Sequence, residues 1–489
     1  MSKTNLVYNV EDKPSWGKTI VFALQQLLAI MAATIAVPAI VNGVTGATMS
    51  QSAALFGAGV GTLVYLLFTK FKSPVFLGSS FAFLGSMFAA FAGGVSMSVG
   101  YLGLIIGAVL AGLVYVILAL IVKFAGTKWI NKIMPPVVIG PTVAIIGLSL
   151  SGNAVGDLFT GNGSPSVNIW IALVCGLITL FTTIVVSVFG KKFLKMIPFI
   201  FGILAGYAVA AIFTGIGHGV GGSIGDGLKV INFDLFSTAQ WGKFLGGWCP
   251  DFTFLTAFSG AYDFNGGNFG TYLGTIAVAY VPVAFVVFAE HIADHKNLSS
   301  IIDRDLLTEP GLHRTLLGDG IGSAAGALFG GCPNTTYGES VGTVAISGNA
   351  SIRTIFVTAI LAIVLSFLLP FSTFLATIPS CVMGGVCIAL YGFIAVSGLK
   401  MIQPVDLGDN RNLFVVSVIL IAGVGGFTLN IALGNNGVIT ITEIACALIL
   451  GILVNLVVHI GDKKKLEEKP AEGESQEEPV QQEEQGEQQ

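Results

Sequence analysis

Two glutamates, Glu290 and Glu339, are the residues of this chain best suited to bind a polar ligand. Glu290 follows the uncharged run 281–289, and Glu339 lies within the glycine- and threonine-containing segment 333–342. An acidic residue near the centre of a bilayer costs about 2.5–3.5 kcal/mol on insertion and usually marks a ligand or proton pathway. We therefore predict that Glu290 exchanges protons and that Glu339 accepts N–H groups of a ligand. The structural alternatives are a hydrogen bond to a neighbouring helix for Glu290 and a helix cap for Glu339.

Three further ionisable residues, His291, Asp294 and His295, follow Glu290 directly. The two histidines at i, i+4 superficially resemble a zinc site, but no third ligand is evident, so we expect no metal. We interpret His295 as a proton relay, and an interfacial structural histidine is the alternative. A membrane enzyme that uses these three residues is a separate hypothesis, which metal analysis would test. Asp319 and Glu443 are interpreted as structural.

The composition requires these residues to be held by membrane helices. The chain has 489 residues, of which 54% are hydrophobic and only 10% charged, and its mean hydropathy is +0.84. A soluble domain carries about 25% charged residues. The 64 glycines also favour close packing of membrane helices. The body of the chain is close to neutral, so we expect no nucleic-acid partner, and the six scattered cysteines predict no disulfide or metal framework.

Apolar stretches long enough for helices predict the number of spans. A bilayer core about 30 Å thick needs about 20 helical residues. The candidate spans lie near 18–41, 52–69, 79–95, 99–122, 134–152, 167–189, 196–215, 273–294, 314–331, 335–348, 354–371, 379–399, 412–430 and 438–460. This is an all-α integral membrane protein with 14 expected spans, of which the third and tenth are short.

The positions of basic residues give the expected orientation. With the N-terminus inside, lysines and arginines of the connections fall almost entirely on the cytoplasmic side, as the positive-inside rule requires. These residues are Lys70, Lys72, Lys123, Lys128, Lys132, Lys191, Lys192, Lys195, Lys296, Arg304, Arg314, Arg353, Lys400 and Arg411. We therefore expect a multi-pass protein of the cytoplasmic membrane, surrounded by lipid, with both termini in the cytoplasm.

Faint repeats divide the chain into two halves of seven spans. For example, Gly59-Val-Gly-Thr62 matches Gly320-Ile-Gly-Ser323. Because seven is odd, two such halves cross the membrane in opposite senses and form an inverted repeat. The expected organisation is a cytoplasmic N-terminus (1–17), a first repeat (18–215), an extracellular linker (216–272), a second repeat (273–460) and a disordered acidic cytoplasmic tail (461–489).

The two short spans predict where a ligand binds. Each begins with a proline and polar or β-branched residues, which favour extended backbone leading into a half-helix. Irregular backbone at this depth is tolerated only where protein buries it or where it lines a cavity. The N-terminus of a half-helix offers free N–H groups to a bound polar group. We therefore expect the site where spans three and ten meet.

Several motifs resemble the nucleobase–ascorbate transporter family (nucleobase:cation symporter-2), and within it the bacterial uracil permeases. The resemblance covers roughly 15–460, and its most specific parts lie at 289–295 and 333–342. The motifs are Gln25-Gln26-Leu27 with Val37-Pro38, Leu77-Gly-Ser-Ser-Phe81-Ala-Phe83, Ala289-Glu-His-x-x-x-His295, Asp305-Leu-Leu-x-x-Pro-Gly-Leu-His-Arg314, Pro333-Asn-Thr-Thr-Tyr-Gly-Glu339-Ser-Val-Gly342, Pro379-x-x-Val-Met-Gly-Gly385 and Leu390-Tyr391-Gly392.

The resemblance implies a core domain (spans 1–4 and 8–11), a gate domain (5–7 and 12–14), and short strands in spans three and ten. It also implies proton-coupled uptake of uracil or a related nucleobase without a cofactor, by a homodimer formed through the gate domains. The implied substrate-binding residues are Glu290, Glu339, Phe81, Gly338, Tyr337, Tyr391 and Ser80, and the implied proton-coupling residues are His295 and Glu290.

The chain departs from the family pattern at Gln26, where the family commonly has histidine, and at Ser340, where uracil permeases usually have asparagine. In the family, glutamine at the position of Glu339 accompanies purine substrates, so the glutamate favours a pyrimidine. A xanthine or other purine permease of the same family is the alternative. An anion transporter of the same fold is a further alternative. The absence of a basic residue near 74–83 and 333–342 argues against it.

Overall fold

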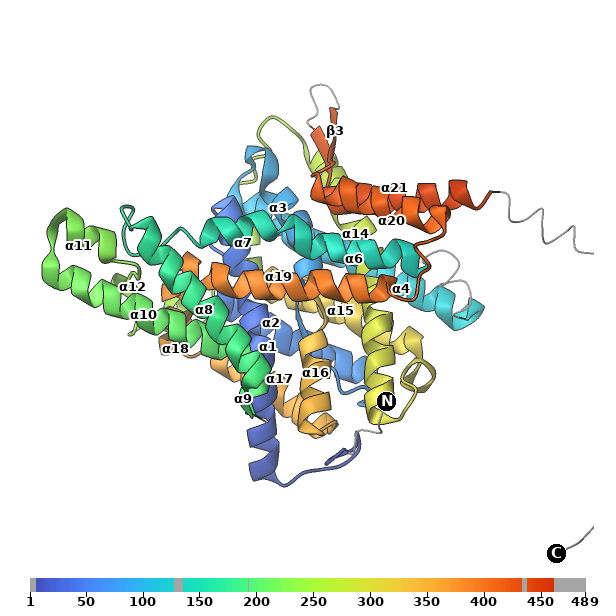
Figure 1. Ribbon diagram of the computed structural model, residues 1–489, viewed down its shortest axis with the longest axis horizontal. Coiled ribbons are helices and arrows are strands. Elements are labelled where there is room, and N and C mark those ends of the chain that lie inside the picture. The colour runs from blue at the N-terminus through green and yellow to red at the C-terminus, as the bar shows by residue number, and fades with distance from the viewer. Residues whose placement is uncertain (1–5, 127–134, 192, 433–437, 461–489) are drawn as a thin grey trace, which may run out of the picture.

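A computed structural model describes residues 6–126, 135–191, 193–432 and 438–460 (Figure 1). The predicted acidic tail, 461–489, therefore lies outside the described residues. The long or paired helices are α1 (Trp16–Thr45), α2 (Gln51–Phe68), α3 (Leu84–Phe91), α4 (Met97–Ala125), α6 (Pro136–Ser149), α7 (Ser151–Asp157), α8 (Ile169–Phe189), α9 (Phe193–Met196), α10 (Pro198–Val220), α14 (Phe269–Ile302), α15 (Leu312–Gly330), α16 (Gly338–Ser347), α17 (Ile352–Ser366), α18 (Leu369–Thr377), α19 (Ser380–Ile402), α20 (Asn410–Val424) and α21 (Glu443–Val458).

The structure confirms a mostly helical membrane protein, while the count of fourteen spans stays a prediction. Among the described residues, eight helices are long and apolar enough to cross a bilayer, or nine if the bent pair α17–α18 forms one span. Each predicted stretch overlaps at least one helix. The third and tenth stretches contain only short helices, because their first residues are extended.

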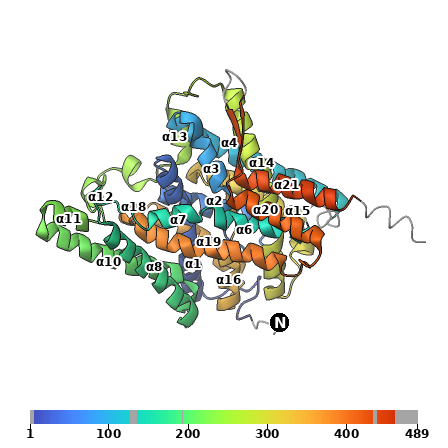
Figure 2. The same ribbon diagram turned by 45° about the horizontal axis from the view of Figure 1, so that its top comes forward.

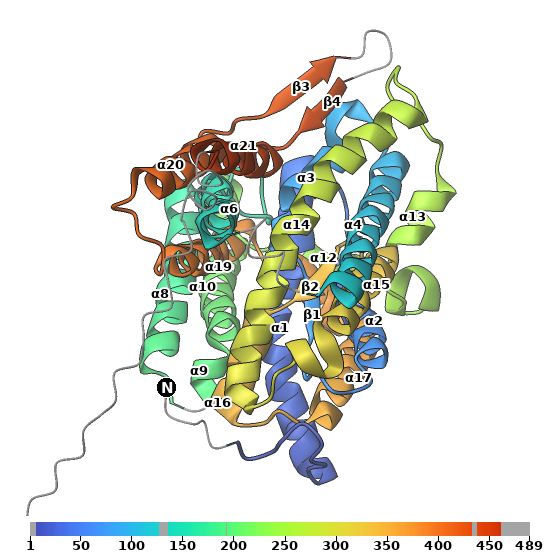
Figure 3. The same ribbon diagram turned by 90° about the vertical axis from the view of Figure 1, so that its right-hand side faces the viewer.

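Two expected helix ends are wrong. Residues at the end of the thirteenth stretch and the start of the fourteenth form strands β3 (Leu429–Ala432) and β4 (Val438–Ile441), which pair antiparallel (Figure 3). Strand β4 consists entirely of valine, isoleucine and threonine, which favour strands, whereas β3 contains one such residue, Ile431. Helices α20 and α21 are consequently shorter than the apolar stretches that contain them.

Helices pack in two groups. The core group consists of α1–α4 and α14–α17, and the gate group consists of α6, α8, α10 and α19–α21. The two groups contain the segments expected in the core and gate domains. In Figure 1 the helices of the gate group form the upper and left parts of the molecule, with α19 crossing in front of α1 and α15.

The linker predicted at 216–272 is more structured than expected. It contains α11 (Gly222–Leu228), α12 (Asp234–Thr238), the π-turn η3 (Phe244–Trp248) and α13 (Thr253–Ser259). Helix α11 packs on α10, α12 on α18, and α13 on α4. The linker therefore crosses one end of the molecule from the gate group to the core group (Figure 2).

Short strands lie in the interior of the core group. Strand β1 (Leu77–Ser79) pairs antiparallel with β2 (Asn334–Thr336), with Gly78 opposite Thr335. Both strands are surrounded by α1, α2, α14 and α15 (Figure 3). The two strands expected from the family resemblance are thus present, and each leads into a short helix, η1 (Phe81–Phe83) with α3 on one side and α16 on the other.

Glycines allow α2 and α15 to cross in direct backbone contact. An ideal Cβ built at Gly57 lies 2.4 Å from the carbonyl oxygen of Gly326, and one at Gly61 lies 2.7 Å from that of Gly322. Small residues at such a crossing give van der Waals contact along the backbones, which drives association in a bilayer. This crossing holds the segments before β1 and β2 together and so fixes the position of both strands.

An ionic cluster closes the predicted cytoplasmic end of the core group. Arg304 binds Glu11 at 2.9 Å and Glu309 at 3.3 Å, and Lys72 also binds Glu309. Lys72 and Arg304 lower the pKa of the Glu309 carboxyl below its ordinary value. The N-terminal segment is also held by backbone contacts between Tyr8 and Gly348–Ala350. The described part of the N-terminus is therefore packed against α16.

Candidate functional site

A cavity of about 50 Å³ lies between the core and gate groups, at the ends of the two short strands. Its size is sufficient for a few water molecules. Six of the seven predicted substrate-binding residues line it: Ser80, Phe81, Glu290, Tyr337, Gly338 and Glu339. The remaining lining residues are Ala82, Ile146, Thr335, Thr336, Leu390 and Ile394. The structure therefore brings together residues from five segments of the sequence.

Two helix N-termini end at this cavity. Tyr337 is the N-cap of α16, and Ser80 is the N-cap of the turn η1 that leads into α3. The first amides of a helix have no intrahelical partner and form its positive end. The backbone N–H groups around Phe81 and Gly338 are therefore placed to donate to carbonyl oxygens of a ligand. The carboxylates of Glu290 and Glu339 supply acceptors beside them.

Tyr337 is held rigidly against the opposite strand. Its hydroxyl donates to the Ser79 carbonyl at 2.6 Å, and Ser80 N–H donates to the Pro333 carbonyl at 2.9 Å. The ring lies over Gly78, where an ideal Cβ would be 2.4 Å from a ring carbon. Only glycine leaves room for this ring. The aromatic wall of the cavity is thus fixed by contacts across β1 and β2.

Tyr391 does not line the cavity. It is 2% exposed, and its ring packs edge-on against Phe81 with the centroids 6.0 Å apart. This contact joins α19 of the gate group to η1 of the core group. Tyr391 therefore supports the wall that Phe81 forms, and its predicted direct contact with a ligand stays a prediction.

Asp294 does not line the cavity but lies beside it, a position that sequence reasoning did not assign to it. The Thr336 hydroxyl donates to Asp294 Oδ2 at 2.8 Å, and an ideal Cβ at Gly338 would lie 4.0 Å from Asp294 Oδ1. Residues four apart share one face of a helix, so the spacing from Glu290 to Asp294 could have indicated this position. Three carboxyl groups therefore surround the first turn of α16.

His295 points away from the cavity and is fully buried. Its Nδ1–H donates to the His291 carbonyl at 2.8 Å, because a carbonyl can only accept. In the neutral ring Nε2 is then an acceptor, and the Tyr65 hydroxyl donates to it at 2.7 Å. Tyr65 also bonds to Ser73 at 2.7 Å. The predicted proton relay therefore faces α2 and the segment before β1, on the far side of α14 from the cavity.

His291 is also occupied by structural contacts. Its Nε2 bonds to the Thr315 hydroxyl at 2.9 Å and its Nδ1 to Asp319 Oδ2 at 2.7 Å. Both histidines thus have partners at both ring nitrogens. Among the described residues, no group of three or more His, Cys, Asp or Glu side chains could hold a metal ion.

The two departures from the family pattern contact each other. Gln26 Nε2 donates to the Ser340 hydroxyl oxygen at 2.7 Å, and that oxygen also accepts from Phe76 N–H at 3.1 Å. The side chains come from α1 and α16 and are separated by 314 positions in the sequence. They join the residue after Glu339 to the segment that leads into β1. These contacts fix the first turn of α16 relative to β1.

Comparison with known proteins identifies the family. The model of a permease family, Xan_ur_permease, matches residues 17–432. The chain belongs to the nucleobase–ascorbate transporter family. It is therefore a multi-pass membrane transporter and not an enzyme.

Three relatives in this family are uracil permeases. The chain is 38% identical over 456 residues to that of Bacillus caldolyticus, covering 92% of this chain and 94% of the relative. It is 37% identical over 463 residues to that of Bacillus subtilis, covering 94% and 96%. It is 32% identical over 462 residues to that of Escherichia coli, covering 94% and 95%.

Two solved structures share the fold. The transmembrane domain of a cyanobacterial bicarbonate transporter, BicA, matches with a TM-score of 0.59 at 15% identity, covering 93% of this chain and all (100%) of that chain. The murine anion transporter Slc26a9 in the inward-facing state matches with a TM-score of 0.58 at 12% identity, covering 93% and 70%. At these identities the likeness shows the fold alone.

Proposed function

We propose that this permease is a proton-coupled symporter that imports uracil across the cytoplasmic membrane. The observation that carries the proposal is the convergence of Glu290, Glu339 and two helix N-termini on one small cavity. Uracil is planar and neutral, with N–H and C=O groups alternating along its edge. Carboxylates match the N–H groups, and backbone amides near Phe81 and Gly338 match the carbonyl groups. The uracil permeases among the relatives support the same substrate.

The walls of the cavity suit the ring of a base. Phe81 and Tyr337 supply aromatic faces, and Ile146, Leu390 and Ile394 supply aliphatic ones. None of the described lining residues is lysine, arginine or histidine. An anion would bury its charge there without a cationic partner, which is costly. The cavity therefore favours a neutral nucleobase over an anion, although the neighbouring folds belong to anion transporters.

Transport in this proposal follows from relative motion of the two helix groups. The polar part of the cavity belongs to the core group, whereas Ile146, Leu390 and Ile394 belong to α6 and α19 of the gate group. Rocking of one group against the other opens the cavity to one side of the membrane at a time. The proposal includes cytoplasmic termini, from the charge pattern, and a homodimer through the gate group.

Uptake of labelled uracil is the direct test. In cells or liposomes that contain the protein, uracil is expected to accumulate faster with an inward proton gradient, and unlabelled uracil is expected to compete better than xanthine because Glu339 favours a pyrimidine. Equal competition by xanthine would support the purine alternative. Failure to bind or transport any nucleobase in proteoliposomes with correctly folded protein would overturn the proposal.

Proton coupling is assigned to the carboxyl groups nearest the cavity. Glu290 exchanges the proton at the ligand. Asp294 lies one helical turn further along α14, where it accepts from Thr336. His295 lies on the far side of α14 and relays the proton through its hydrogen bond with Tyr65. Replacing Asp294 with asparagine keeps its size and its bond to Thr336 but removes a protonation site. We expect Asp294→Asn to retain uracil binding and to lose most of the response of uptake to a proton gradient.

The matched measurement compares uptake with and without the gradient in Asp294→Asn and His295→Gln. If His295→Gln alone abolishes the response, the relay behind α14 carries the coupling and Asp294 is structural. If neither substitution changes the response, the proton pathway lies elsewhere.

A further inference from the structure

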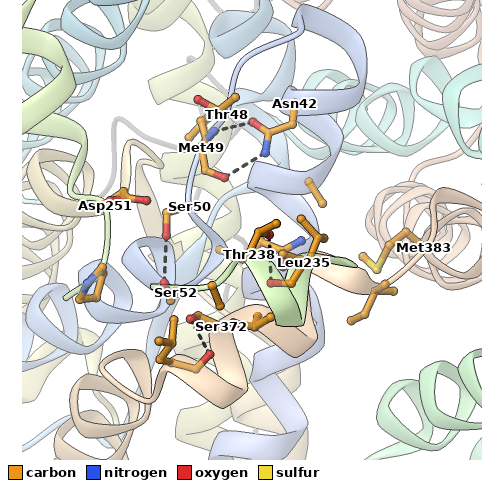
Figure 4. A pocket seen from close by; sticks show the side chains of 18 of the residues that line it. Asn42, Thr48, Met49, Ser50, Ser52, Leu235, Thr238, Asp251, Ser372 and Met383 are labelled. Carbon is orange, nitrogen blue, oxygen red and sulfur yellow. Dashed lines mark hydrogen bonds between the residues drawn. The ribbon is translucent and has the colours of Figure 1, made fainter. Parts of the chain in front are cut away.

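A second cavity, of about 590 Å³, is shown in Figure 4. It shares two elements with the first one, α19 and the α6–α7 segment. Its core-group wall comes from the end of α1 and the start of α2, including Asn42 and Gln51. On the gate side, the wall comes from Asp157 of α7, which packs on α19, and from the start of α19 at Met383. Helix α18, which packs on α2 and α17, contributes further lining residues. Residues 235–251 of the linker cover it. The charge pattern predicts this end of the molecule to be extracellular.

The core-group wall is preorganised. Asn42 Nδ2 donates to the Met49 carbonyl at 2.9 Å and Met49 N–H donates to Asn42 Oδ1 at 2.7 Å, so one side chain closes the α1–α2 loop. Ser50 and Ser52 are joined at 2.9 Å (Figure 4). A wall fixed by its own hydrogen bonds does not need a ligand to hold its shape, which lowers the cost of binding one.

The two cavities lie along the same interface. Helix α19 contributes Met383 to the larger cavity and Leu390 to the smaller one, seven residues and about 10 Å further along its axis. The continuous α6–α7 segment likewise contributes Asp157 to the larger and Ile146 to the smaller cavity. A solute that moves between the core and gate groups therefore meets the larger cavity before or after the smaller one.

The larger cavity contains hydrogen-bond acceptors that lack donors. Gln51 Oε1 is buried and has no hydrogen-bond partner among the described residues. The half-buried Asp157 carboxylate has no hydrogen bond or ion pair within the same residues, and no described lining residue is lysine, arginine or histidine. A carboxylate without a donor in the protein favours a ligand that supplies N–H groups, and its charge disfavours an anion.

We propose that this cavity is an outer vestibule that binds a neutral, N–H-bearing planar base, the substrate class of the central cavity, before the base reaches Glu290. Asp157 accepts its N–H groups, and Met383 with Leu235 supplies apolar walls. The inference rests on the proposed function, because it takes the same substrate class. It adds a second binding position and a role for the linker, whose residues 235–251 form the cover of that position.

The rate at which Cys249 is chemically labelled measures whether the vestibule is occupied. It lies in the wall of the larger cavity and is the only described cysteine that is not buried. Burial and then Asp251 raise the pKa of its thiol, so labelling with a membrane-impermeant maleimide is run at mildly alkaline pH. With uracil at ten times its Kd for the vestibule, labelling is expected to slow about tenfold by mass action. Cys249→Ser gives the background.

Substitutions distinguish binding of the base in the vestibule from binding in the central cavity. Protection of Cys249 is expected to persist in Glu290→Ala, which disables the central cavity. Asp157→Ala is expected to raise the uracil concentration for half-protection about 10- to 100-fold, because a hydrogen bond to a charged group is lost. Asp226→Ala is the matched control, since Asp226 pairs with Lys229 at 2.9 Å and does not line the cavity.

Uracil binding to the purified unsubstituted protein is measured in parallel. Binding without any protection of Cys249, or protection that disappears in Glu290→Ala and is unaffected by Asp157→Ala, overturns the vestibule and leaves the proposed function intact. Absence of binding altogether overturns the proposed function itself.

Discussion

Uracil uptake is expected to fall about 100-fold when Glu290 is replaced by glutamine, because a hydrogen bond to a charged group contributes about 1.5–3 kcal/mol. The substitution keeps the size of the side chain. It replaces an acceptor-only carboxylate with an amide that can direct its own N–H groups at those of the base. It also removes a protonation site from the cavity. Glu290 lines the cavity directly, so the loss is expected in binding as well as in transport.

Initial uptake rates at equal surface abundance measure this effect. Glu443→Gln is the matched control, since Glu443 lies in the first turn of α21 and does not line the small cavity. We expect that variant to transport like the unsubstituted chain. Normal uptake by Glu290→Gln would show that the base binds elsewhere or without this carboxylate.

The fold is expected to be most sensitive at the crossing of α2 and α15. A methyl group at Gly57 would lie 2.4 Å from the Gly326 carbonyl oxygen and 3.2 Å from the Gly330 amide nitrogen. Both are backbone atoms. Backbone cannot move aside as a side chain can, so Gly57→Ala forces the two helices apart. We expect it to destabilise the protein by about 1–3 kcal/mol, the usual cost of overpacking.

Thermal stability in detergent and the yield of monodisperse protein measure this cost. Gly215→Ala on α10 is the matched control, because an ideal Cβ there has no other atom within 4 Å. Alanine is a better helix former than glycine by about 1 kcal/mol in water, so the control is expected to be neutral or more stable. Equal stability of both variants would show that the two helices can separate at little cost.

The contrast between His295 and Asp294 shows where reading the sequence was incomplete. Asp294 is four residues from Glu290 and so about 40° around the helix, whereas His295 is five residues away and about 140° around it. The family resemblance and the usual proton chemistry of histidine favour His295 as the relay. Helical geometry alone already favoured Asp294 as the neighbour of Glu290, and the bond to Thr336 places it there.

The number of spans cannot be read from length and hydropathy alone, because some spans contain extended backbone. Length and hydropathy detect α1, α4 and α14 readily, because each is a continuous apolar helix. The segments around β1–α3 and β2–α16 are too short for that criterion, since part of each is extended backbone buried among other helices. The β3–β4 hairpin was missed because its apolar residues also suit a helix within a longer apolar run.

The sequence by itself determined that this protein lies in a membrane, that Glu290 sits in an apolar segment and Glu339 at the start of a short one, and that two segments begin with extended backbone. These are properties of residues close together in the chain, so composition and periodicity reveal them. Only the tertiary structure decided that Glu290 and Glu339 share one cavity, that Tyr391 supports Phe81 from behind, and that Gln26 bonds to Ser340. Those contacts depend on how distant helices pack, and packing is set by the fit of many side chains at once.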